Sequence, residues 1–295
     1  MATVSGGTAS ERFGFVLRYK DQFGVAMLCK WLSVSRSGYY SWLEREASMR
    51  TQEDHYLLQK IIAIYEKSES RYGSPRVFRA LVAQGIQVGR KRVERLMREA
   101  NLRGRVSLVT RRQPGLKRFV AKGNNLLLEH GNATTLDQVW VTDVTYLKLK
   151  GRWQYLATVM DQCSRRILGW SLAETRTTKL STDALMYALK KRNYPKGIII
   201  HSDRGGEFTG WEFQSMLGKY ELNHSVNRPG HCTDNAFMES FYHSLKAELI
   251  RGTVFNSLEN LRRSISRYIN QFYNSVRLHS GLDYVSPMEY EQRFA

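Results

Sequence analysis

The order of strand-like and helical patterns after residue 135 constrains the fold more than any other feature of this chain. Three β-rich runs come first, at 138–147, 153–160 and 167–172. Then helical and strand-like patterns alternate, with the helices at 182–192, 211–220 and 235–250 and the strands at 197–201 and 224–227. The strand at 197–201 is almost entirely apolar, which is typical of a buried strand. Two antiparallel hairpins followed by strand–helix–strand crossovers predict a mixed α/β sheet with helices on its faces.

The front of the chain carries helical patterns instead. Helices are indicated at 25–32, 39–46, 52–66, 76–84 and 90–100, joined by short turns that contain glycine or proline. The last of them has an apolar side and a basic side, and the basic residues are Arg90, Lys91, Arg92, Arg95 and Arg98. A basic helix after a Gly-containing turn is typical of the recognition helix of a helix-turn-helix unit, although an ordinary solvated helix shows the same periodicity.

The charge distribution favours the DNA-binding interpretation of that helix. Lys and Arg number 45 against 27 Asp and Glu, a net charge of +18. Residues 1–130 hold 24 basic and 11 acidic residues, while residues 131–295 hold 21 and 16. An excess of this size points to a polyanion, nucleic acid before an anionic membrane. We therefore interpret 103–132, which contains Arg111 and Arg112, as a basic linker that follows a phosphate backbone.

Several other classes of protein are disfavoured. The longest apolar runs, such as Ile198–Ile200, are far too short to span a bilayer, and the first ten residues lack the apolar core of a secretory signal. The three cysteines, Cys29, Cys163 and Cys232, lie far apart and support neither a disulfide framework nor a thiolate zinc site. A reducing, intracellular compartment fits this composition best.

Three carboxylates stand out by their positions. Asp143 lies in the middle of the first strand, Asp203 directly follows the buried strand, and Glu239 lies on the first turns of the long helix. Each one alone has an ordinary explanation as a turn, cap or solvated residue. Together they could converge on one edge of the sheet, where they would need cations to stay ionised. Oxygen ligands suit Mg²⁺, and two such ions about 3.5–4 Å apart suit in-line displacement at phosphorus.

The local context of these acids resembles the DDE transposases of the retroviral-integrase superfamily. Between Asp203 and Glu239 lie 35 residues, the best-known spacing of that family, and Lys246 matches the basic residue that insertion-sequence members carry seven positions later. The three blocks are Trp140-x-x-Asp143-x-Thr145-Tyr146, His201-Ser202-Asp203-x-Gly205 and Asp234-Asn235-Ala236-x-x-Glu239-Ser240-Phe241. Further blocks resemble the second-reading-frame product of the IS3 family, namely Arg71-Tyr72-Gly73 with Arg76, and Tyr273-Asn274-x-x-Arg277-x-His279.

This resemblance implies a fold and a site. The fold is a ribonuclease-H-like integrase core at 133–252, preceded by an all-α DNA-binding region with helix-turn-helix units at 1–102 and followed by a helical extension at 253–295. Asp143, Asp203 and Glu239 are implied as catalytic residues and as ligands of two Mg²⁺ ions, for which Mn²⁺ would substitute. Lys246 is implied as a DNA contact near the scissile phosphate, and 230–233 as the catalytic loop.

The resemblance also implies an activity and partners. The activity is cleavage at the ends of a bacterial insertion sequence to give a 3′ hydroxyl, followed by strand transfer. The partners are double-stranded DNA (terminal inverted repeats and target), at least one second copy of the chain, and an upstream-frame protein with a helix-turn-helix and leucine zipper. The protein is expected in the bacterial cytoplasm, on the nucleoid. Two alternatives stay open: a nuclease that cleaves without joining, and a DNA-binding regulator without activity.

A few further residues have ordinary explanations. Trp31, Trp42, Tyr39 and Tyr40 lie at helical spacing and are expected in the core rather than as base-stacking groups. His201 is expected either next to the site or as a satisfied buried histidine. Glu207 lies close to Asp203, but nothing in the motif makes it a ligand.

Overall fold

The structure is a computed structural model that describes residues 7–44, 48–105, 124–228 and 235–294. The chain divides into two compact units, residues 1–63 and 64–295. This division differs from the boundary expected at residue 102. The physical reason is that residues 71–76 hydrogen-bond to residues 248–278, so that the second half of the helical region belongs to the unit that contains the sheet.

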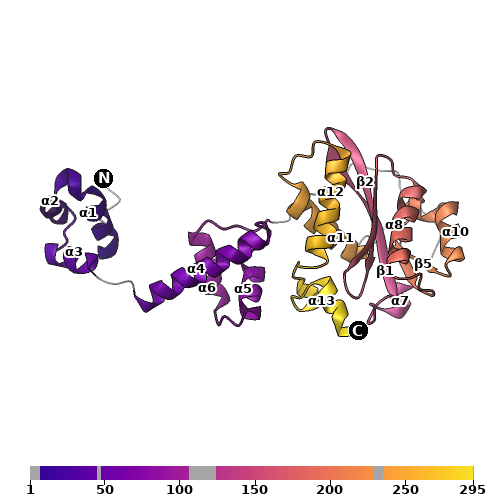
Figure 1. Ribbon diagram of the computed structural model, residues 1–295, viewed down its shortest axis with the longest axis horizontal. Coiled ribbons are helices and arrows are strands. Elements are labelled where there is room, and N and C mark those ends of the chain that lie inside the picture. Colours follow the sequence, from indigo (N-terminus) through magenta and orange to yellow (C-terminus); the bar gives the residue numbers. More distant parts are fainter. Residues whose placement is uncertain (1–6, 45–47, 106–123, 229–234, 295) are drawn as a thin grey trace. The chain divides into compact units, whose positions relative to one another are not determined.

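The first unit contains a small cluster of three helices (Figure 1), α1 (Ala9–Phe23), α2 (Val25–Trp31) and α3 (Arg36–Leu43). Their shared core includes Val16, Leu28 and Tyr39. Tyr39 is buried as expected, and Trp42 is half-buried against this core. The expectation is wrong for Trp31 and Tyr40, which are 59% and 45% exposed, because helices of seven and eight residues can each bury only one narrow face.

The helical region continues with α4 (Met49–Lys67), α5 (Ser74–Ala83) and α6 (Arg90–Glu99). A short turn joins α5 to α6, as the sequence predicts. Helix α6 buries Val93, Leu96 and Met97 and leaves Arg90 and Lys91 exposed. The amphipathic helix expected at 90–100 is therefore confirmed, with its basic side toward solvent.

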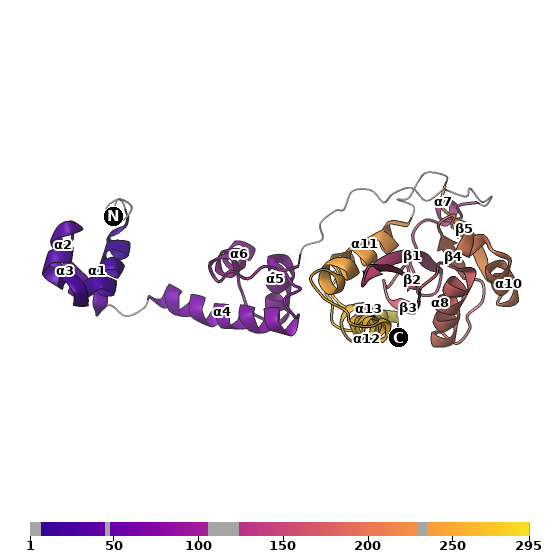
Figure 2. The same cartoon turned by 90° about the horizontal axis from the view of Figure 1, so that it is seen from above.

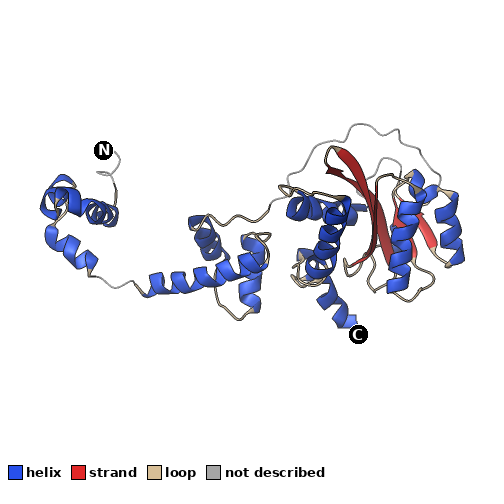
Figure 3. Cartoon of the chain, turned by 45° about the horizontal axis from the view of Figure 1, so that its top comes forward, coloured by secondary structure: helices blue, strands red, loops and turns tan. Residues whose placement is uncertain are grey.

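A five-stranded mixed sheet forms the centre of the second unit (Figures 1 and 3). Its strands are β1 (Val139–Leu149), β2 (Arg152–Asp161), β3 (Ile167–Ala173), β4 (Ile199–Ser202) and β5 (Asn223–Val226). They lie in the order β3-β2-β1-β4-β5, with β1–β2 and β2–β3 antiparallel and β1–β4 and β4–β5 parallel. The predicted arrangement of hairpins followed by crossovers is confirmed.

Helices cover both faces of the sheet (Figure 2). One side holds α8 (Thr178–Lys191), α9 (Gly206–Thr209) and α10 (Trp211–Lys219), whose apolar residues pack against the strands in one core. On the other side lie α11 (Ala236–Leu245) and α12 (Leu258–Arg267), each of which continues as a π-helical turn, at Lys246–Ile250 and Tyr268–Tyr273. The chain ends with 3₁₀ turns at Ser280–Leu282 and Gln292–Phe294 around α13 (Pro287–Glu291).

The end of the predicted basic linker is hydrogen-bonded to the edge of the sheet. Helix α7 (Leu127–His130) lies within it, and just before this helix the Asn124 carbonyl accepts a hydrogen bond from the Val226 N–H at 3.0 Å. The Leu126 N–H donates to the Ser225 hydroxyl at 3.0 Å. These bonds attach the segment to edge strand β5, so the described part of the catalytic half begins at residue 124 rather than 133.

Across the part of the chain that the structure describes, no helix is long and apolar enough to cross a bilayer.

Candidate active site

Strand register places Asp143 and Asp203 at the same level of the sheet. Val141 of β1 pairs in parallel with His201 of β4. Two residues further along, Asp143 lies within β1 and Asp203 directly follows the end of β4. The Asp143 carboxylate accepts a hydrogen bond from the Val144 N–H at 2.7 Å, and that of Asp203 from the Gly205 N–H at 2.9 Å. Burial, and then the like charge of Asp203, raise the pKa of Asp143 well above its usual range. Two acids held this way form a site that attracts cations.

An arginine that no motif indicates lies beside this pair. Arg176, from the loop between β3 and α8, places Nη2 at 3.9 Å from Asp203 Oδ2. Its Nε donates to Oε1 of Glu207 at 2.8 Å, and Glu207 is buried. Glu207 is thus the ion-pair partner of Arg176. This agrees with the motif, which gives Glu207 no role as a metal ligand. Sequence reasoning missed Arg176 because the loop around it carries no distinctive pattern.

Helix α11 is attached to β1 on both sides of Glu239. Asn235 occupies the N-cap position of α11, and its side-chain amide donates to the Thr142 carbonyl at 3.0 Å. The buried Tyr242 hydroxyl donates to the Asp143 carbonyl at 2.5 Å and also contacts the Thr158 hydroxyl. Burial, and then the charge of Asp143, raise the pKa of Tyr242 well above its usual range. The position of Tyr242, three residues after Glu239 on the helix, is the only signal that could have indicated this anchoring role.

Glu239 itself is exposed on the first turn of α11. The structure brings Asp143 and Asp203 together, but it does not bring Glu239 into a ligand group with them. Indeed, in the described ranges no three His, Cys, Asp or Glu side chains form a group that could hold a metal. The expected catalytic loop, 230–233, lies outside the described residues. The aspartate pair, in which burial and the charge of Asp203 raise the pKa of Asp143, fits a divalent cation, and Glu239 lies on the helix that is bonded to β1.

Comparison with known proteins identifies the family. Residues 133–232 and 220–287 each match a family described as integrase core domain, and residues 51–111 match an HTH-like domain. The chain is 35% identical over 288 residues to transposase InsF for insertion sequence IS3A of Escherichia coli K12, covering 96% of this chain and 99% of that protein. The chain belongs to the IS3 family of transposases.

Another curated relative is as similar to the chain, and one solved structure is similar over part of it. A 31 kDa protein of insertion element IS600 from Shigella sonnei is 35% identical over 267 residues, covering 90% of this chain and 98% of that protein. The HTLV-2 integrase catalytic core domain in complex with magnesium is similar over 52% of this chain and 95% of its own, with 18% identity and a TM-score of 0.40. The resemblance drawn from the sequence, with its integrase-like mixed sheet and helix-turn-helix region, is confirmed.

In this transposase Lys246 opens the π-helical turn that follows α11. Its ammonium lies over the ring of Tyr146, 4.7 Å from the centroid. Burial lowers the pKa of Lys246, while the charge of Asp143 opposes that shift. This lysine is therefore within electrostatic reach of Asp143. His201 is fully buried and its Nδ1 hydrogen-bonds the Ser225 hydroxyl at 2.8 Å, which fits a core histidine.

The basic residues expected to bind DNA lie in different surroundings. On α6, Arg90, Lys91 and Arg98 are exposed, while Arg92 and Arg95 are half-buried. Arg95 forms an ion pair of 3.0 Å with Glu99, one turn further along the helix. Arg111 and Arg112 lie outside the described residues.

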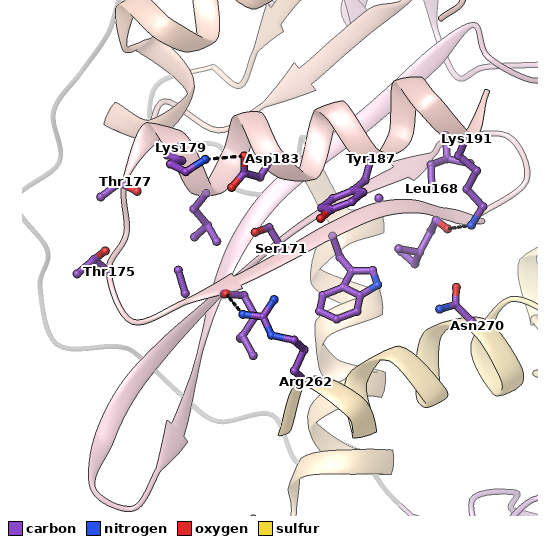
Figure 4. A pocket seen from close by; sticks show the side chains of 16 residues that line it. Leu168, Ser171, Thr175, Thr177, Lys179, Asp183, Tyr187, Lys191, Arg262 and Asn270 are labelled. Atoms are coloured by element: carbon purple, nitrogen blue, oxygen red, sulfur yellow. Dashed lines mark hydrogen bonds and ion pairs between the residues drawn. The ribbon is translucent and has the colours of Figure 1, made fainter. Parts of the chain in front are cut away.

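A cavity of about 570 Å³ lies away from the acids, along strand β3 (Figure 4). It is lined by β3, α8 and residues of the C-terminal helices. Arg262 donates to the Leu172 carbonyl at 2.9 Å and Lys191 to the Ile167 carbonyl at 3.3 Å. Because β3 is the edge strand, these side chains occupy backbone acceptors that could otherwise pair with another strand. The side chains around this cavity thus cover the edge of the sheet. None of Asp143, Asp203 and Glu239 lines the cavity.

Proposed function

We propose that this transposase cuts one DNA strand at each end of its insertion sequence and joins the exposed 3′ hydroxyl to another phosphodiester in the same site. The observation that carries the proposal is the aspartate pair at one level of two neighbouring parallel strands. Family membership supports the DNA substrate, and the raised pKa of Asp143 supports a site that becomes stable only with added positive charge.

Asp143, Asp203 and Glu239 are proposed as the residues that would hold two Mg²⁺ ions, for which Mn²⁺ would substitute. Bound cations of this kind align an in-line displacement at phosphorus and neutralise the charge that develops in it. The protein's own part is positioning. Asn235 and Tyr242 attach the helix of Glu239 to β1, and Arg176 faces Asp203. Lys246 is proposed to hold a phosphate beside the one that is cut.

The helical region is proposed to bind the ends of the element. Helix α6 presents Arg90, Lys91 and Arg98 to solvent, as a recognition helix requires, and Arg92, Arg95, Arg111 and Arg112 are proposed to add phosphate contacts. In this division of labour, 1–102 binds DNA, 103–132 links, 133–252 catalyses and 253–295 supports the core. At least two copies are needed to hold two ends, and an upstream-frame partner would add specificity. Such a reaction takes place in the bacterial cytoplasm, on the nucleoid.

Labelled DNA from the ends of the element, incubated with the purified chain and Mg²⁺, Mn²⁺ or EDTA, tests the proposal on a denaturing gel. Metal-dependent cleavage together with longer joined products is expected. Asp203→Asn should abolish both products but keep gel-shift binding, because the carboxylate holds metal rather than duplex. Asp183→Asn, an acid on α8 at the far cavity, is the matched control and should keep both activities.

Other outcomes assign the alternatives. Cleavage without joining would indicate a nuclease, and binding without either product would indicate a regulator. Loss of DNA binding in Asp203→Asn, equal to its loss of cleavage, would contradict the ligand role of Asp203.

A further inference from the structure

The hairpin formed by β1 and β2 extends beyond its neighbours in the sheet (Figure 3). Strand β4 pairs with β1 only at residues 139–141, and β3 pairs with β2 only at residues 155–160. We call residues 146–154 the hairpin ribbon. Apart from Tyr146, whose partner is Tyr155, its strand residues pair only with each other. The ribbon begins three residues after Asp143 on the same strand.

The hairpin ribbon carries cations and an exposed tryptophan. Lys148, Lys150 and Arg152 are exposed, and no acidic residue occurs between Asp143 and Asp161. Trp153, directly opposite Lys148, is 49% exposed. A large aromatic face left in water among unopposed cations is unusual for a strand that only stabilises a fold, and it is the surface chemistry of single-strand nucleic-acid binding.

Ring and cation contacts connect this tryptophan to the catalytic helix. Lys246 lies over the Tyr146 ring at 4.7 Å, and the Tyr146 and Trp153 rings meet edge to face at 5.0 Å. Lys148 lies 5.7 Å from the centroid of Trp153. Lys246, Tyr146, Trp153 and Lys148 thus form a continuous strip of contacts, which starts at a lysine influenced by the charge of Asp143 and runs out along the ribbon.

We propose that the hairpin ribbon binds an unpaired nucleotide next to the cleaved phosphodiester, with its base stacked on Trp153 and its flanking phosphates held by Lys148, Lys150 and Arg152. This rests on the proposed function, which puts the cut strand at Asp143 and Asp203. A base within a duplex is covered by its neighbours, so only a base released from the stack presents its face to a tryptophan. The exposed lysines disfavour a protein partner, because Lys is depleted in protein–protein interfaces relative to the rest of the surface.

Binding without catalysis tests this inference on the full-length chain. In EDTA, fluorescence anisotropy compares a blunt duplex that stops at the cleavage position with the same duplex carrying a three-nucleotide single-stranded extension past it. The chain should bind the extended DNA more tightly. Trp153→Ala should weaken that binding by about 5- to 150-fold, the range for losing one stacked base, and leave blunt-duplex binding unchanged. Trp153→Phe should keep most of the preference.

Two further measurements sharpen the result. A 2-aminopurine in the extension should be quenched by the parent chain and not by Trp153→Ala. Trp211→Ala removes a tryptophan that is 80% exposed on α10, and this matched control should change neither affinity nor quenching.

The results that would overturn the inference are distinct from those that would overturn the proposed function. If the parent chain and Trp153→Ala bind the extended DNA with equal affinity, the ribbon site is contradicted and the proposed function is not affected. Equal loss on both DNAs shows that the ribbon contacts duplex and again removes the unpaired-base site. A parent chain that binds neither DNA contradicts the proposed function, and the ribbon site with it.

Discussion

At the scale of single residues, the site is a balance of neighbouring charges. Asp143 and Asp203 repel each other, and Arg176 lies between Asp203 and the buried carboxylate of Glu207. The guanidinium is bonded to Glu207 and only approaches Asp203 at 3.9 Å. Glu207 therefore keeps the arginine from pairing fully with the proposed metal ligand.

Glu207→Gln tests that balance. Without the stronger carboxylate, Arg176 should move toward Asp203 and compete with the cation. The Mg²⁺ concentration for half-maximal cleavage should rise by about fivefold, equivalent to about 1 kcal/mol. Titrating Mg²⁺ in the cleavage assay measures it, and adding Arg176→Gln in the same chain should reverse the rise. An unchanged Mg²⁺ requirement in Glu207→Gln would show that Glu207 does not restrain Arg176.

His279 provides a prediction about pH. Burial, followed by the charges of Arg277 and Arg76, lowers the pKa of His279 to about 2. The unfolded chain takes up this proton below about pH 6.5, whereas the folded chain does not, so stability is present above pH 6.5 and is lost as the pH falls toward 2. Between pH 6.5 and 5 the loss from this residue should be about 2 kcal/mol.

Urea unfolding of the parent chain and of His279→Gln at pH 7.5 and pH 5.0 measures that contribution. The loss of unfolding free energy on acidification should be about 2 kcal/mol smaller in the variant, because glutamine does not titrate. Identical acid dependence in the two proteins would mean that His279 is protonated in the folded chain.

At the scale of elements, two helices divide the proposed work. Helix α11 is bonded to β1 at both Thr142 and Asp143, and its regular winding changes to a π-helical turn at Lys246. Such turns are frequent at functional sites because they re-aim the side chains that follow. Helix α6 instead keeps one face buried and the other basic, as a DNA-reading helix requires.

Replacing Arg90 and Lys91 by alanine tests α6. Both are exposed at the first turn of the helix, so these substitutions should weaken DNA binding without unfolding the chain. The slope of log affinity against log salt should flatten by about one unit for each phosphate that the helix no longer touches. Lys190→Ala with Lys196→Ala removes two exposed lysines, one in the last turn of α8 and one between α8 and β4, and serves as the control. Equal slopes in both double variants would exclude α6 from the DNA interface.

At the scale of the whole second unit, Glu248 joins the helical region to the catalytic half. Its carboxylate accepts hydrogen bonds from Arg277 at 2.9–3.2 Å and from the Tyr268 hydroxyl at 2.8 Å, and Arg76 lies 3.7 Å away. Its carbonyl accepts from Arg71 and Arg105. The carboxylate is 4% exposed, so this is a buried ion cluster that includes residues from before and after the sheet.

Glu248→Ala should lower the unfolding free energy by about 3–5 kcal/mol, because it leaves buried guanidinium groups without their counter-charge. Urea denaturation measures this. Limited proteolysis should then cut between residues 64 and 105 sooner than in the parent chain. Tyr72→Phe, which removes the hydroxyl bonded to the Val276 carbonyl and the Leu278 N–H, should cost only about 1 kcal/mol. Equal losses in the two variants would mean that the charge cluster adds nothing beyond ordinary hydrogen bonds.

Much of this protein was decided by the sequence alone. The order of strand and helix patterns determined the mixed sheet, because the two periodicities are local properties of the chain. The proximity of Asp143, within one strand, and Asp203, directly after its neighbour, could also be predicted, because parallel strands that pair bring equivalent positions together. The basic face of α6 was equally visible, because its charges repeat at helical spacing.

Only the tertiary structure decided how distant segments combine. Two separate sequence blocks illustrate this: one contains Arg71, Tyr72 and Arg76, and the other contains Tyr273, Arg277 and His279. The structure shows that these blocks meet around Glu248. The same holds for the ion pair of Arg176 with Glu207 and for the strip that contains Trp153, because both also join residues far apart in the sequence. Such contacts depend on the packing of segments up to about 200 positions apart, as between Tyr72 and Val276, and no local periodicity carries that information. The exposed side chains of Trp31 and Tyr40 show the same limit of sequence periodicity. Periodicity predicts which face of a helix is apolar but not whether a neighbouring element covers that face.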